Sequence, residues 1–169
     1  MLKRIRATNR ELPGAQFAIV ASEYNSRYVE AMLRCARQVL RRSRAKQIEV
    51  IRVPGAFEIP AVVARLLKRE PDDFDAIICL GVILQGETEH ARLIAEAVSH
   101  ALAQLQVTHA VPIIHEVLLF ESEQQAKVRC LSRTHNRGAE AASTALAMAK
   151  VMRGLIPRQS LLEFLKTKR

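Results

Sequence analysis

The stretch DAIICLGVILQGETEH, residues 75–90, decides the fold that we predict for this chain. Its first part, residues 76–80, is a continuous apolar run, typical of a strand buried on both faces of a parallel sheet. Gly86 and a short polar cluster follow, and a helical pattern begins at once. The junction of a buried strand with a helix N-terminus is where α/β proteins bind ligands, often anions. An ordinary strand–helix turn with a surface histidine accounts for the stretch equally well.

Similar units lie on both sides of this stretch. The other strands are expected at 17–21, 48–53 and 110–114, and the helices at about 26–42, 60–68, 88–106, 123–131, 138–153 and 159–165. The alternation of strands and helices predicts a three-layer α/β/α sandwich around a four-stranded parallel sheet. Pro112 cannot donate a ladder hydrogen bond, so the fourth strand is expected at an edge.

Four unusual segments follow the predicted strands. Tyr24 and Asn25 come after the first strand, Ala56 to Glu58 after the second, Gly86 to His90 after the third, and His115 after the fourth. Right-handed crossovers place the carboxyl ends of all strands at one edge of the sheet. The four segments should therefore meet there, which is the main argument from the residues for a functional site.

Composition sets the broad class of the chain. Its 169 residues form one predicted domain, with an N-terminal arm at 1–15 and a basic extension at 154–169. The net charge of +9 permits a polyanionic partner, but no nucleic-acid motif is present, so nucleic acid is not expected as the primary partner. Three widely spaced cysteines and the absence of a long apolar run predict a reduced, cytoplasmic protein without a membrane segment.

Three residues in these loops are suited to binding an organic ligand. Tyr24 and Phe57 are aromatic residues in polar loops, and their rings can stack on a flat heterocycle or fold back onto the core. Glu58 can accept hydrogen bonds from sugar hydroxyls, or it can lie in the first turn of a helix as a carboxylate that favours the dipole.

Anion binding and proton transfer have their own candidates. Thr88 and neighbouring N–H groups are suited to a phosphate, and Arg129 and Arg137 can complete its charge or lie in solvent. His90 is a candidate for moving protons, because the imidazole ring can donate and accept them. The five histidines have no metal-ligand spacing and the chain has no nucleotide-binding motif, so neither a metal nor another cofactor is expected.

Three segments together resemble the lumazine synthase family: VPGAFEIP at 53–60, GVILQGETEH at 81–90 and HNRGAEAA at 135–142. The resemblance covers roughly residues 15–153. It implies a flavodoxin-like fold and condensation of 5-amino-6-(D-ribitylamino)uracil with 3,4-dihydroxy-2-butanone 4-phosphate. The products would be 6,7-dimethyl-8-ribityllumazine, phosphate and water, in the penultimate step of riboflavin biosynthesis.

The resemblance also implies residue roles. His90 would transfer protons. The aminouracil would contact Tyr24, Asn25, Ala56, Phe57, Glu58, Val82, Ile83, Leu84 and His115, and the butanone phosphate would contact Glu87, Thr88, Arg129 and Arg137. Family members assemble as pentamers or as shells of 60 subunits, in which His115, Arg129 and Arg137 would reach the site of a neighbour.

The chain departs from the family pattern in three places. Gln85 replaces a common arginine, His115 replaces a phenylalanine that covers the ring, and the C-terminal tail extends beyond the usual end. These departures are also consistent with an alternative function, in which the chain is a relative that binds a flavin or lumazine, or forms a shell, without catalysing the reaction. The resemblance further implies an N-terminal arm that adds a fifth strand to a neighbour, and association with riboflavin synthase. The loop at 130–137 has no insertion of the kind associated with family members that form only pentamers, so the resemblance favours a shell of 60 subunits.

Overall fold

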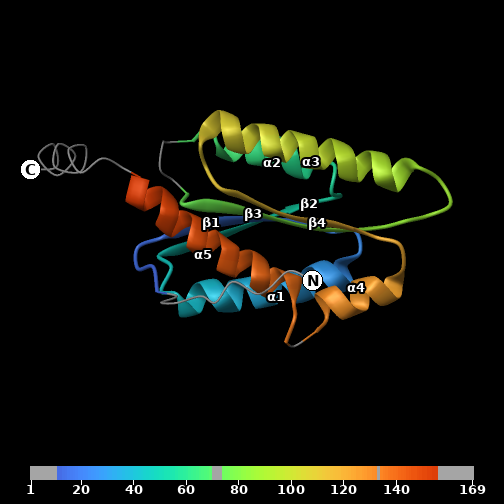
Figure 1. The fold of residues 1–169 in the computed structure, drawn as a ribbon, viewed down its shortest axis with the longest axis horizontal. Coiled ribbons are helices and arrows are strands. Elements are labelled where there is room, and N and C mark those ends of the chain that lie inside the picture. The colour runs from blue at the N-terminus through green and yellow to red at the C-terminus, as the bar shows by residue number, and fades with distance from the viewer. Residues whose placement is uncertain (1–10, 70–73, 133, 156–169) are drawn as a thin grey trace, which may run out of the picture.

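The computed structural model describes residues 11–69, 74–132 and 134–155, and Figure 1 shows its arrangement. Its elements are β1 (Gln16–Ser22), α1 (Ser26–Arg42), β2 (Gln47–Val53), α2 (Ile59–Leu66), β3 (Ala76–Leu84), α3 (His90–His109), β4 (Ile113–Phe120), α4 (Glu123–Cys130) and α5 (Arg137–Leu155). The predicted N-terminal strand exchange at 1–10 and the predicted helix at 159–165 lie outside the described residues.

The four strands form one parallel sheet in the order β2-β1-β3-β4. The two central strands are the most apolar, because both of their faces are covered: six of the seven residues of β1 and eight of the nine of β3 are buried. The predicted flavodoxin-like α/β fold is confirmed. The edge position of the fourth strand is also confirmed.

Helices cover both faces of the sheet (Figure 1). One buried cluster joins α1, α4 and α5 to the sheet, and a second joins α2 and α3 to the opposite face. In α5 the buried residues Ala141, Ala145 and Ala149 recur every fourth position, so their small side chains let this helix pack closely on α1. None of the helices among the described residues is long and apolar enough to cross a membrane.

Two strands differ from the prediction in ways that matter for the site. β3 continues to Leu84 instead of ending at residue 80. The fourth strand was expected at 110–114 but begins at Ile113, because Pro112 has no N–H and only its carbonyl takes part, accepting from Ile77 N at 2.9 Å. His115 therefore lies inside β4, paired with Cys79, and the prediction that it follows the strand at the carboxyl edge is wrong.

Candidate active site

A cleft of about 720 Å³ lies where β1, β2 and β3 end, a volume typical of small-molecule sites. It is lined by Tyr24, Asn25, Gly55, Ala56, Phe57, Glu58, Val82, Ile83, Leu84, Gly86, Thr88, His90, Ala91 and Ile94. These residues come from three separate segments, which meet because parallel strands end at one edge. The structure therefore brings ten of the fourteen sequence-predicted site residues into one cleft.

The two aromatic residues of the cleft are exposed rather than folded back onto the core. The Tyr24 side chain is 72% exposed and Phe57 is 60% exposed. A Cβ atom on Gly55 would approach the Tyr24 ring to 3.1 Å, so glycine at this position leaves room for the ring. Both rings are available to a flat ligand, which favours the stacking interpretation over the alternative of a lid on the core.

Asn25 ties two walls of the cleft together. It has a left-handed backbone (φ 55°) immediately before α1, and its side chain makes no cap hydrogen bond to that helix. Instead, Nδ2 donates to the carbonyl oxygen of Val82 at 2.8 Å. This bond fixes the turn after β1 to the end of β3, and so it sets where the neighbouring Tyr24 enters the cleft.

Glu58 stabilises the turn after β2 from within. Its Oε2 accepts a hydrogen bond from the backbone N–H of Gly55 at 2.9 Å, and the side chain is exposed. Only one carboxylate oxygen is used in this way. The other has no hydrogen-bond partner among the described residues, so it can accept from a ligand hydroxyl.

The third wall is the loop between β3 and α3. The Gln85 side chain donates to the carbonyl oxygens of Gly86 at 3.0 Å and Thr88 at 2.8 Å, which holds the loop in place. The helix was expected from residue 88 but begins at His90, and no side chain caps its first turn. Thr88 and His90 line the cleft, whereas Glu87 is exposed on the same loop without lining it.

His115 lies outside this cleft, against α3. Its Nδ1 accepts from Val117 N at 3.3 Å, so Nε2 carries the proton and donates to Ser99 Oγ at 2.8 Å. The Ser99 hydroxyl in turn donates to the carbonyl of Ala95 at 2.7 Å. Burial lowers the pKa of His115, in agreement with this neutral tautomer.

The two predicted arginines also lie outside the cleft of their own chain. Arg129 is exposed on α4, and Arg137 is the first residue of α5. Arg137 is held by two carboxylates: its Nη2 lies 2.5 Å from Glu116 Oε1 and its Nη1 lies 2.7 Å from Glu140 Oε2. Burial raises the pKa of Glu116 to about 7, and the Arg137 charge opposes that rise.

Four residues that line the cleft were not among the predicted site residues, namely Gly55, Gly86, Ala91 and Ile94, and Glu116 beside Arg137 was missed as well. Ile94 lies four residues after His90 on the same helix face, and that spacing was the available signal, whereas Ala91 follows His90 directly. Glu116 is 4% exposed, and a lone acid in an apolar strand was its only sign. Among the described residues, no three His, Cys, Asp or Glu side chains gather in a metal-binding arrangement.

Comparisons with known proteins agree with this geometry. The family model described as 6,7-dimethyl-8-ribityllumazine synthase matches residues 14–153. A protein of that name from Pyrococcus furiosus is 37% identical over 142 residues, covering 84% of this chain and 88% of the relative. Another, from Halorhodospira halophila, is 37% identical over 146 residues, covering 85% of this chain and 92% of the relative. The chain therefore belongs to the 6,7-dimethyl-8-ribityllumazine synthase family.

Proposed function

We propose that this chain catalyses the condensation of 5-amino-6-(D-ribitylamino)uracil with 3,4-dihydroxy-2-butanone 4-phosphate. The observation that carries the proposal is the single cleft into which the segments 53–60 and 81–90 bring their aromatic, carboxylate and histidine side chains. The products are 6,7-dimethyl-8-ribityllumazine, phosphate and water. The chain then performs the penultimate step of riboflavin biosynthesis as a transferase.

The aminouracil occupies the part of the cleft built by the turns after β1 and β2. Its flat ring stacks on the exposed faces of Tyr24 and Phe57. The backbone of Ala56 and of 82–84 offers hydrogen-bonding groups to the ring, with Asn25 beside them. The free oxygen of Glu58 accepts from a ribityl hydroxyl, because its partner oxygen already holds Gly55.

The butanone phosphate occupies the loop before α3. The uncapped first turn of α3, the backbone N–H of Glu87 and the Thr88 hydroxyl hold its phosphate, which the helix dipole favours. Gln85 is uncharged, and its amide is engaged by two carbonyls of the loop. Arg129 and Arg137 then matter more, as the arginines available for the phosphate charge.

The reaction asks for little acid–base power. The aminouracil amine attacks the ketone, a first water leaves to give an imine, and phosphate is eliminated. The ribitylamino nitrogen then attacks the remaining carbonyl, and a second water leaves as the ring closes. Holding two reactive substrates in line supplies much of the acceleration. His90, which lines the cleft, transfers protons in these steps.

The active site is completed by a second subunit. His115, Arg129 and Arg137 do not line the cleft of their own chain, so a neighbour in a homopentamer must supply them to it. We favour a shell of 60 subunits built from such pentamers, with riboflavin synthase as a further partner. Free Cys35, Cys79 and Cys130 support a reducing, cytoplasmic location. Light scattering of the purified protein measures the assembly.

Absorbance of the lumazine product tests the catalytic proposal. Purified protein is mixed with both substrates, and product formation is followed above the uncatalysed background. Glu58→Gln should raise KM for the aminouracil by roughly 10-fold or more, and Thr88→Val should raise KM for the butanone phosphate instead, since each removes one polar contact. The two variants are controls for each other.

The assay also separates the enzyme from a relative that only binds ligand. Protein that assembles and binds lumazine, yet gives no rate above background, is not a synthase. In that case His115→Phe and Gln85→Arg, which restore the usual family residues, test whether these two departures explain the loss.

A further inference from the structure

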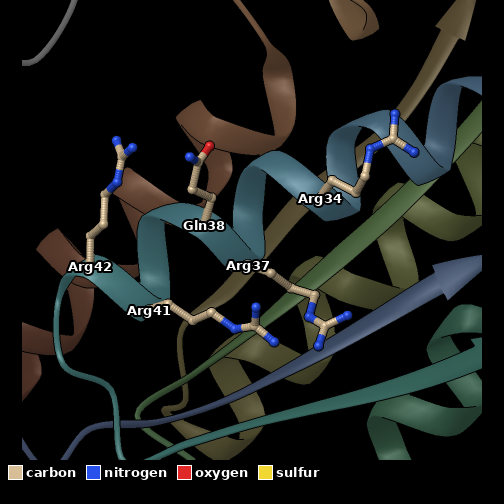
Figure 2. A pocket seen from close by; sticks show the side chains of 5 residues that line it. All are labelled: Arg34, Arg37, Gln38, Arg41 and Arg42. Atoms are coloured by element: carbon tan, nitrogen blue, oxygen red, sulfur yellow. The ribbon is translucent and has the colours of Figure 1, made fainter.

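Four arginines stand along one outward stripe of α1. They are Arg34, Arg37, Arg41 and Arg42, and with Gln38 they line an open surface hollow of about 360 Å³. Arg34, Arg37 and Arg41 are three and four residues apart, which places them on neighbouring turns of the helix, and Arg42 follows Arg41 directly. Figure 2 shows Gln38 and Arg42 extending to one side of α1, and Arg37 and Arg41 to the other. We call these four arginines the α1 stripe.

The α1 stripe differs from most of the other described arginines in having no acidic partner. Within the described residues, ion pairs with carboxylates occupy Arg44, Arg52, Arg69, Arg92, Arg137 and Arg153. No hydrogen bond or ion pair engages the guanidinium of any stripe arginine there. Single arginines such as Arg65 and Arg129 also have no carboxylate partner in this part of the chain, but only in the stripe do four such arginines lie together on one helix.

This arrangement is unfavourable for the helix itself. Like charges three or four residues apart destabilise a helix by about 0.2–0.5 kcal/mol per pair. The C-terminal dipole offsets the cost for Arg41 and Arg42, which lie in the last turn, but not for Arg34. A bound anion would offset it for the whole stripe.

The proposed synthase reaction has no need of these charges. The N-terminus of α1 follows Asn25 in the cleft, whereas Arg41 lies 16 residues further on, a rise of about 24 Å. None of the stripe residues lines the cleft. The stripe is a separate surface, at the end of α1 remote from the cleft.

We propose that the α1 stripe binds the phosphodiester backbone of single-stranded RNA without reading its bases. Guanidinium groups match phosphate oxygens through paired N–H donors, and a row of them follows a chain of phosphates. The net charge of +9 draws a polyanion to the protein. No aromatic residue lines the hollow, so the contact rests on the phosphate charges and not on stacking of bases on aromatic rings.

A membrane surface fits the stripe less well than RNA does. Helices that lie in a lipid interface carry a broad apolar face that enters the acyl region, next to the cationic one. On α1 the apolar residues face the sheet and α5 and are buried, among them Met32, Ala36 and Leu40. Only the charged face remains for a partner, which favours a soluble polyanion.

Salt-dependent binding of RNA tests the proposal on the full chain. The probe is fluorescein-labelled oligouridylate of about 20 nucleotides, longer than the ~4–16 nucleotides that one small domain covers. One variant carries Arg34→Gln, Arg37→Gln and Arg41→Gln. The control variant removes the same charge elsewhere, through Arg65→Gln, Lys68→Gln and Lys150→Gln, all exposed. Affinity is measured between about 50 and 200 mM salt.

The stripe variant should bind RNA at least 10-fold more weakly at low salt. Its plot of log affinity against log salt should be shallower by about 2, since each single-strand phosphate contact contributes about 0.7. The control should keep the wild-type slope, and both variants should form lumazine at the wild-type rate. Equal losses in the two variants would overturn the proposal, because net charge alone would explain them. If the stripe variant sedimented differently from wild type but bound RNA equally well, the proposal would also be overturned. The stripe would then be a contact surface for a second copy of the chain.

Discussion

The guanidinium of Arg137 is held by the buried carboxylate of Glu116, with both Nε and Nη2 lying 2.5 Å from Oε1. Glu116 comes from β4 and Arg137 begins α5, so the pair joins the edge strand to the last of the described helices. Glu140, one turn along α5, holds the remaining Nη1 at 2.7 Å. A residue proposed to meet the substrate phosphate of a neighbour is thereby oriented by two acids of its own chain.

Replacing Glu116 by Gln should change how stability depends on pH. The carboxyl pKa rises from 4.5 to about 7 on folding, so the folded state holds the proton more tightly than the unfolded state. The stability from this group is present below pH 4.5 and is lost as pH rises to about 7, on the order of 3 kcal/mol in all. In urea unfolding from pH 5 to 8, the free energy of unfolding of wild type should decrease relative to that of Glu116→Gln as pH rises. Parallel curves would contradict the raised pKa.

Replacing His115 by Phe should act in the opposite direction. Burial lowers the pKa of His115 below its ordinary 6.5, so the unfolded chain binds a proton that the folded chain refuses. Wild-type stability should therefore fall as pH drops below about 6.5, and His115→Phe should lack this component. Unfolding at pH 7 and 5 measures both proteins. A difference in unfolding free energy between the two proteins that is the same at both pH values would contradict the lowered pKa of His115. Lumazine affinity that already falls near pH 6.5, in wild type and not in His115→Phe, would contradict it as well.

Replacing His90 by Ala should slow the reaction without abolishing it. General acid–base catalysis contributes about 10² to 10⁴-fold, whereas alignment of the two substrates remains in the variant. Lumazine absorbance gives kcat, and light scattering confirms assembly. Complete loss of activity in an assembled variant would mean that His90 does more than transfer protons.

Local patterns were sufficient to predict the architecture. The apolar run at 76–80 reflects a strand with two buried faces, and the apolar stripes of the helices reflect one buried face each. Both patterns can be recognised in the sequence alone. The start of β4 was misplaced because residues 110–120 are mostly apolar, and Pro112 was interpreted as the mark of an edge strand and not as the residue before its start. There the missing N–H of Pro112 decided the boundary, and His115 moved from the edge into the strand.

The candidate site was predictable only as far as strand order dictates it. Tyr24, Phe57 and His90 meet because each follows a parallel strand, and that rule needs no side-chain detail. The pair of Glu116 and Arg137 is separated by 21 residues and follows no periodic pattern, so only the folded chain reveals it. Gln85 was predicted as a lost charge, and the structure adds that its amide braces the loop.

Substitutions at Asn25 should separate its hydrogen bond from its backbone strain. Asn25→Gly loses the bond to the Val82 carbonyl but tolerates φ 55°, at a cost of about 1 kcal/mol. Asn25→Ala loses the bond and adds left-handed strain of about 1–2 kcal/mol. Urea unfolding should therefore rank wild type above Gly and Gly above Ala. Equal stability of the two variants would show that strain at this turn is negligible.

Replacing Gly138 by Ala should disrupt the packing of α5 on α1. A Cβ atom at Gly138 would lie 2.0 Å from the carbonyl oxygen of Met32, which belongs to the backbone of α1 and cannot move aside alone. Overpacking of this kind costs about 1–3 kcal/mol or more. Gly154, near the end of the same helix, is the matched control, because no atom lies within 4 Å of its Cβ position. Gly154→Ala should be neutral or stabilising by up to about 1 kcal/mol through helix propensity. If thermal unfolding gave the two variants the same midpoint, the close approach of α1 and α5 would have to be relaxed in solution.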